Sequence, residues 1–152
     1  MKTLFPAIRV TDLDGSISFY RTVGYDLVGT VAIDVGTRLA MLALPEEAEV
    51  SLELVHRPAG GPVSPGGLDH LAVQVDDLAV VRQLLIDGGY EPGEVETPGG
   101  TGGPRTSWVA DPDGYRLELV QWPDGHPAGM TRDDFSESRS QMRPDGVDEQ
   151  ER

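Results

Sequence analysis

The chain contains an internal repeat whose two copies are separated by 65 positions. The tetrapeptide Leu-Glu-Leu-Val occurs at residues 52–55 and again at 117–120, and the same shift places residues 8–27 over residues 73–92. Asp-Leu and Gly-Tyr pairs coincide within the longer segments. Because one shift aligns segments that lie far apart, chance similarity is a poor explanation. The repeat predicts two copies of one structural module.

Each copy has the pattern of a strand, a helix and three further strands. Asp12 and Asp77 stand where the two helices begin, and an aspartate there can accept hydrogen bonds from the free amides of the first turn. The sequence Asp-Pro-Asp-Gly at 111–114 is typical of a hairpin turn. The expected strands are 4–10, 26–35, 38–44 and 50–56 in the first copy, and 69–75, 91–96, 105–111 and 115–122 in the second.

This order of elements predicts an α+β fold, in which two βαβββ modules form a curved mixed sheet with the helices on its outer face. We expect the first module to span residues 1–56 and the second to span residues 68–122. Residues 57–67 are rich in proline and glycine, which is typical of a linker. The acidic tail, residues 123–152, does not continue the repeat, and we expect it to be mobile.

Composition excludes several classes of function. The 152 residues include 12 Lys and Arg against 26 Asp and Glu, so the net charge of −14 repels phosphate backbones and anionic membrane surfaces. No segment approaches the about 20 apolar residues of a membrane span, and the first residues do not resemble a signal peptide. Cysteine is absent, which favours a reducing compartment. We therefore expect a cytoplasmic protein without nucleic-acid or membrane partners.

The repeat places Glu53 and Glu118 in equivalent strands, each between two leucines. Side chains alternate across a strand, so the leucines should face the core and each glutamate the opposite, concave side. A solvated sheet face is the most common environment of such a glutamate. Two equivalent glutamates in register nevertheless favour a shared site.

A histidine joins these glutamates in the predicted arrangement. His70 lies on the first strand of the second copy, and the equivalent residue of the first copy is Phe5. A pseudo-twofold relation between the modules would bring Glu53, Glu118, His70 and Phe5 around one centre or its symmetry mate. Glutamate and histidine suit a divalent ion such as Zn, Ni, Co, Mn or Fe. A lone histidine at a strand start is more often structural or exposed, and only its place on the repeat favours a ligand.

Four segments resemble the vicinal oxygen chelate superfamily, which includes glyoxalase I, bleomycin-resistance proteins and extradiol dioxygenases. The resemblance covers nearly all of residues 4–122 and is strongest to glyoxalase I. It is carried by residues 8–29, 51–56, 68–78 and 110–121.

The resemblance implies metal ligands at Glu53, His70 and Glu118, and it places Phe5 where the family usually has a histidine. It also implies that Arg9 holds a carboxylate of a thiol cofactor, a task that suits a guanidinium fork. An ordinary surface charge at the end of a strand is the alternative for Arg9.

Two functions compete on these residues. The first is a glyoxalase I-like, metal-dependent lyase that isomerises a thiol–2-oxoaldehyde adduct through an enediolate, with Glu118 as the base. The second is a metal-free, bleomycin-resistance-type protein that sequesters an antibiotic or other aromatic molecule, on which Phe5, Trp108 and Trp122 could stack. Phe5 favours sequestration, whereas the three retained ligands favour the enzyme. A related epimerase or dioxygenase fits the ligand pattern less well.

The expected assembly is a homodimer with two equivalent sites, in which Glu53 belongs either to the same chain as His70 and Glu118 or to the other chain.

Residues 97–104 are rich in glycine and lack the ending of a phosphate-binding loop, so we expect a flexible flap over the cleft.

Overall fold

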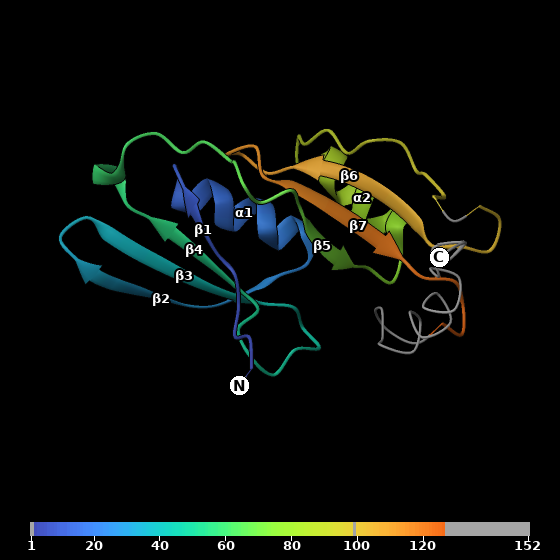
Figure 1. The fold of residues 1–152 in the computed structure, drawn as a ribbon, viewed down its shortest axis with the longest axis horizontal. Coiled ribbons are helices and arrows are strands. Elements are labelled where there is room, and N and C mark those ends of the chain that lie inside the picture. The colour runs from blue at the N-terminus through green and yellow to red at the C-terminus, as the bar shows by residue number, and fades with distance from the viewer. Residues whose placement is uncertain (1, 99, 127–152) are drawn as a thin grey trace, which may run out of the picture.

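The computed structural model describes residues 2–98 and 100–126 (Figure 1). The elements are β1 (Ala7–Val10), α1 (Leu13–Val23), β2 (Asp26–Asp34), β3 (Thr37–Ala43), β4 (Leu52–His56), the 3-10 helix η1 (Pro58–Gly60), β5 (Leu71–Gln74), α2 (Leu78–Asp87), β6 (Arg105–Ala110) and β7 (Arg116–Gln121). Most of the predicted acidic tail, residues 127–152, lies outside the described part of the chain.

Both predicted helix starts are confirmed. Asp12 Oδ1 accepts hydrogen bonds from two backbone amides of the first turn of α1, at 3.1 and 3.2 Å. Asp77 Oδ1 does the same for α2, at 2.9 and 3.1 Å. Gly24 ends α1 with a φ of 127°, a conformation that a residue with a Cβ adopts only with strain. Neither helix of the described residues has the length and apolar character needed to cross a membrane.

The α+β fold with two related modules is confirmed, and each module forms its own mixed sheet. The first sheet has the order β1-β4-β3-β2 and the second the order β5-β7-β6. Their parallel pairs repeat with the same shift as the sequence, because Ala7 pairs with Glu53 and Ala72 pairs with Glu118. The duplication therefore extends from the residue pattern to the strand register.

The predicted strand at residues 91–96 is wrong. Only an isolated bridge between Glu96 and Thr106 remains, and the rest of the segment follows β6 irregularly. Proline has no backbone N–H to donate to a ladder and glycine weakens a strand, so Pro92 and Gly93 interrupt regular pairing. The second sheet consequently has three strands where the first has four.

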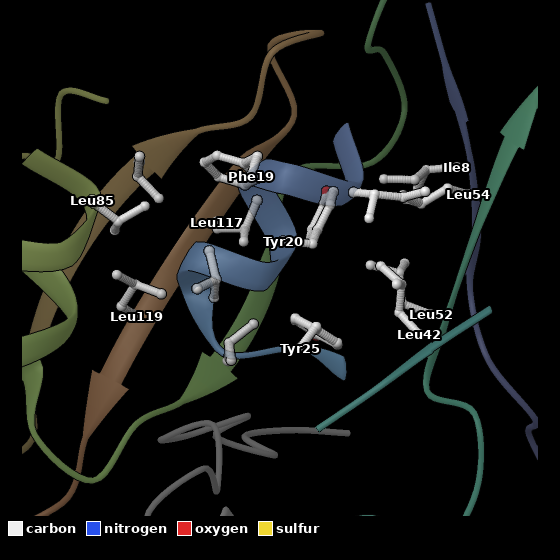
Figure 2. Close-up of a cluster of buried hydrophobic side chains, with 14 of the residues drawn as sticks. Ile8, Phe19, Tyr20, Tyr25, Leu42, Leu52, Leu54, Leu85, Leu117 and Leu119 are labelled. Carbon is white, nitrogen blue, oxygen red and sulfur yellow. The ribbon is translucent and has the colours of Figure 1, made fainter. Parts of the chain in front are cut away.

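One buried core joins the two modules. Figure 2 shows the rings of Phe19 and Tyr20, on α1, between leucines of the first sheet and leucines of the second. Leu54 on β4 and Leu117 on β7 are both fully buried in this cluster. Helix α1 therefore contributes to the interior of both modules. The glutamate-bearing face of each sheet lies opposite this core, as strand alternation predicts.

Two polar contacts also connect the modules. The Tyr20 hydroxyl donates to Asp111 Oδ2 at 3.0 Å in a buried environment. The amide of Thr11 donates to Asp113 Oδ2 at 2.9 Å. Both carboxylates belong to the turn between β6 and β7. This turn of the second module therefore bonds to Tyr20 on α1 and to Thr11, just before α1.

Candidate functional site

The structure brings together two of the three predicted metal ligands. Glu118 lies on β7, and His70 immediately precedes β5, its parallel neighbour. His70 Nε2 lies 3.6 Å from Glu118 Oε2, and the two side chains are 34% and 22% exposed. Both occupy the face of the second sheet that is turned away from the core, where solvent and ligands can reach them.

Asp69 completes this cluster, and sequence reasoning did not identify it. Its Oδ1 lies 2.6 Å from His70 Nδ1. The hydrogen bond to His70, followed by the charge of His70, holds the pKa of Asp69 below its usual value. In the neutral tautomer with its proton on Nδ1, His70 would present the lone pair of Nε2 toward Glu118, which is the orientation that a metal ligand needs.

An aromatic residue and an arginine border the same cluster. Trp108 on β6 pairs with Glu118 across the ladder, and its ring meets the His70 ring edge-on at 5.1 Å. The guanidinium carbon of Arg116 lies 4.4 Å from the centre of the Trp108 ring. Trp108 was predicted as a binding residue, whereas Arg116 was not. The available signal was strand alternation, which places Arg116 on the same face as Glu118.

A cavity of about 380 Å³ opens beside Glu118. Its lining is mostly apolar and consists of Ala72, Val73, Gln74, Pro98, Pro104, Thr106, Glu118, Val120 and Trp122. Pro98 and Pro104 belong to the predicted flap, so this segment borders the cavity. A carboxylate at the wall of an apolar cavity can orient a small organic ligand or move a proton within it.

Glu53 is not part of this cluster in the single chain. It lies on β4 of the first sheet, between Ala7 and Met41 of the neighbouring strands. Within residues 2–98 and 100–126, no group of three acidic or histidine side chains is close enough to hold a metal ion. One chain therefore supplies His70 and Glu118 at one place and Glu53 at another.

Phe5 and Arg9 lie near the start of the first sheet. Phe5 precedes β1 and is half-buried. Arg9 Nη2 donates to the carbonyl of Gly61 at 2.9 Å, so the linker engages the arginine predicted to bind a thiol cofactor. Its Nε is buried and has no hydrogen-bond partner in the described residues. A cavity of about 320 Å³ between β1 and the linker includes Arg9 and Tyr115.

Comparison with known proteins identifies the family. A sequence profile of the Glyoxalase/Bleomycin resistance protein/Dioxygenase superfamily matches residues 4–119. The chain belongs to this superfamily. A probable lactoylglutathione lyase from Vibrio cholerae is 34% identical to it over 137 residues, which cover 85% of this chain and 96% of that relative.

Solved structures of the glyoxalase superfamily share the fold. A glyoxalase I variant from Zea mays superposes with a TM-score of 0.65 and 26% identity, covering 81% of this chain and 45% of that one. An antibiotic-binding protein from Streptomyces sp. CB03234 superposes with a TM-score of 0.62 and 24% identity, covering 81% of this chain and 98% of that one. The second similarity concerns the fold alone, which hosts both catalysis and binding.

The distance between His70 and Glu118 suits two ligands of one divalent ion, but these two residues alone do not complete a site. Two ligands that bind one ion at about 2.1 Å lie about 3 to 3.6 Å apart, depending on the angle between them. The observed 3.6 Å between Nε2 and Oε2 falls at the upper end of this range. A catalytic ion needs a third protein ligand, and the described part of one chain does not offer it at this place.

Proposed function

We propose that this protein is a glyoxalase I-like lyase that isomerises a thiol–2-oxoaldehyde adduct to the thioester of a 2-hydroxy acid. The contact between His70 and Glu118 beside an apolar cavity is the observation that carries this proposal. The similarity to a probable lactoylglutathione lyase over most of both chains supports it. The lack of cysteine fits a reducing compartment, so we place the activity in the cytoplasm.

Glu118 is the proposed base. Its carboxylate would remove the proton from the carbon that carries sulfur and return it to the adjacent carbon, so the substrate gains and loses no atoms. The cavity beside it would hold the side group of the oxoaldehyde away from water. Trp108 would cover one side of this region, and Phe5 of a second copy, on the sheet that carries Glu53, would supply an apolar surface.

His70, Glu118 and Glu53 would hold the metal ion, with two ligands from one chain and the third from a second copy. A divalent ion there would act as a Lewis acid for the negative charge that develops on the substrate oxygen. The faces of the sheets support a shared arrangement: both glutamates lie opposite the core, and in one chain they lie on different sheets. A homodimer could place the first sheet of one copy against the second sheet of the other.

Metal content and turnover test this proposal together. Protein purified without chelator should contain close to one divalent ion per chain and should form thioester from the glutathione–methylglyoxal adduct. Glu118→Gln should lose both the ion and about 100-fold or more of the activity, because a base and a ligand disappear together. Glu91→Gln is the matched control, since Glu91 is exposed and lies outside the cluster. Wild-type protein that is metal-free and inactive would refute the proposed lyase function.

Mixing two inactive variants tests whether the site is shared between chains. In a hybrid of Glu53→Gln with Glu118→Gln, one site would lose both glutamates and the other would keep both. Random exchange of subunits should therefore restore about a quarter of the wild-type activity. Activity that stays at the level of the separate variants would contradict a shared site, and light scattering should independently report a dimer.

Sequestration of an aromatic molecule is the second candidate, and one observation favours it. The cavity beside Glu118 is mostly apolar and is bordered by Trp122, while Phe5 replaces the usual first ligand. Such a site could bind a planar natural product without metal. Tight binding of an aromatic antibiotic by metal-free protein, together with no thioester formation, would support this function over the first.

A further inference from the structure

Arg116 is an exposed cation without an assigned role, and it lies at the edge of the candidate site. It begins β7, two residues before Glu118. No carboxylate of the described residues lies within ion-pair distance of its guanidinium, although the charge of Arg116 contributes to the lowered pKa of Asp69. Asp69 already bonds to His70. The guanidinium therefore keeps its hydrogen-bond donors available for a ligand.

The position of this guanidinium is restrained by Trp108. The guanidinium carbon lies 4.4 Å from the centre of the indole ring, and the same ring packs edge-on against His70 at 5.1 Å. An arginine stacked on an aromatic face keeps its planar fork directed outward and loses less freedom when it binds. Arg116, Trp108 and His70 thus form one row along the face that carries Glu118.

Arg116 and Glu118 follow one another on the same face of β7. Residues two positions apart on one face of a strand are separated by about 7 Å. Arg116 and Glu118 are therefore neighbours along this face, and the guanidinium lies beside Trp108, the residue paired with Glu118. A thiol conjugate of a small peptide can span this distance with a carboxylate at one end and the reacting carbon at the other.

Arg9, to which the family resemblance assigns the thiol carboxylate, is hydrogen-bonded to the linker instead. Arg9 Nη2 donates to the Gly61 carbonyl at 2.9 Å. The linker also passes close to this guanidinium, since a Cβ added at Gly60 would lie only 2.7 Å from Nη2. Arg9 therefore fixes the path of the linker in this chain, and its fork is not free in the way that the fork of Arg116 is.

We propose that Arg116 and Trp108 form an anion subsite that binds a carboxylate of the substrate's thiol portion. The identity of the reacting group rests on the proposed lyase function, whereas the anion subsite can be tested by binding alone. The guanidinium would receive the carboxylate in a two-pronged hydrogen bond, with the indole ring as its support. The subsite would thus select thiols that carry a negative charge at this distance.

Binding of inert thioethers tests the subsite. The probes are S-hexylglutathione and its dimethyl ester, which lacks both carboxylates, titrated by calorimetry against wild type, Arg116→Gln and Arg9→Gln. Arg116→Gln should weaken binding of the diacid by about 10- to 100-fold and leave binding of the diester within about twofold. Arg116→Lys should lose less, because it keeps the charge without the planar fork.

Several results would overturn the subsite. These are an equal loss of both probes in Arg116→Gln, a carboxylate-specific loss in Arg9→Gln instead, or no binding of either probe to wild-type protein. Thermal unfolding of each variant checks that the fold is intact. Thioester formation is measured on the same preparations, so the two proposals fail separately. A carboxylate preference that depends on Arg116 in an inactive protein would retain the subsite and refute the lyase.

Discussion

The hydroxyl of Tyr20 should stabilise the protein chiefly when Asp111 is ionised, and Tyr20→Phe tests this. Tyr20 is fully buried and Asp111 is 5% exposed. The hydroxyl donates to Asp111 Oδ2 at 3.0 Å, whereas Oδ1 accepts from the backbone amides of Asp113 and Tyr115. A hydrogen bond to a charged group contributes about 1.5–3 kcal/mol. At neutral pH we therefore expect Tyr20→Phe to lower the free energy of unfolding by about that amount.

The destabilisation caused by Tyr20→Phe should become larger as the pH rises. Burial raises the pKa of Asp111, although hydrogen bonds from Tyr115, Tyr20 and Asp113 oppose the rise. With a raised folded pKa, the stability contributed by Asp111 is fully present below the unfolded pKa and is lost as the pH rises through the folded pKa. Tyr20→Phe removes a group that lowers this pKa, so the loss becomes larger. The difference from wild type should therefore grow as the pH rises through the folded pKa of Asp111, which lies above the usual pKa of aspartate.

Urea unfolding at several pH values and one fixed chain concentration measures this difference. A fixed concentration is needed because the proposed self-association would make the measured stability depend on it. Tyr25→Phe is the matched control: Tyr25 is also 5% exposed, and burial, followed by the charge of Glu47, raises its pKa to about 12, but its hydroxyl bonds to no carboxylate among the described residues. A pH-independent effect of Tyr20→Phe, or one no larger than that of Tyr25→Phe, would refute the reasoning.

Two smaller predictions concern the caps and the site. Asp77→Ala should lower the free energy of unfolding by about 0.5–2 kcal/mol, because two amides of α2 lose their acceptor. Asp76→Ala is the control in thermal unfolding, and equal effects would contradict the capping role. The contact between Asp69 and His70 predicts that neutral His70 carries its proton on Nδ1. Nitrogen NMR should show this tautomer, and Asp69→Ala should shift His70 toward the Nε2–H form, whereas an unchanged spectrum would count against it.

Local patterns in the sequence predicted most of the fold. The repeat gave the order of elements, the aspartate caps gave the helix starts, and alternation placed Glu53 and Glu118 opposite the core. The strand expected at 91–96 does not form, because Pro92 and Gly93 cannot support a regular ladder even though the repeat predicts a strand there.

The candidate site was less predictable, since its geometry depends on contacts between distant segments. The proximity of His70 to Glu118 followed from the parallel pairing of their strands. The bond from Arg9 to Gly61 depends on the path of a linker that carries no periodic pattern, so no sequence signal indicated it. The location of Glu53 relative to the pair depends on how the two sheets of the chain are placed.

The two copies of the module have diverged around their equivalent glutamates. Glu118 has Trp108 and Ala72 beside it on the neighbouring strands, whereas Glu53 has Met41 and Ala7. The second sheet has His70 and Arg116 on its glutamate face, whereas the first sheet has Arg9 on its glutamate face, two residues after Ala7, and Phe5 at the position equivalent to His70.

Pairing two first sheets would bury two carboxylates without a histidine. In the proposed dimer, a first sheet placed against a second sheet would instead join Glu53 to His70 and Glu118. Duplication thus explains the common geometry of the two faces, and divergence of the residues around each glutamate explains why one complete site would need one face of each kind.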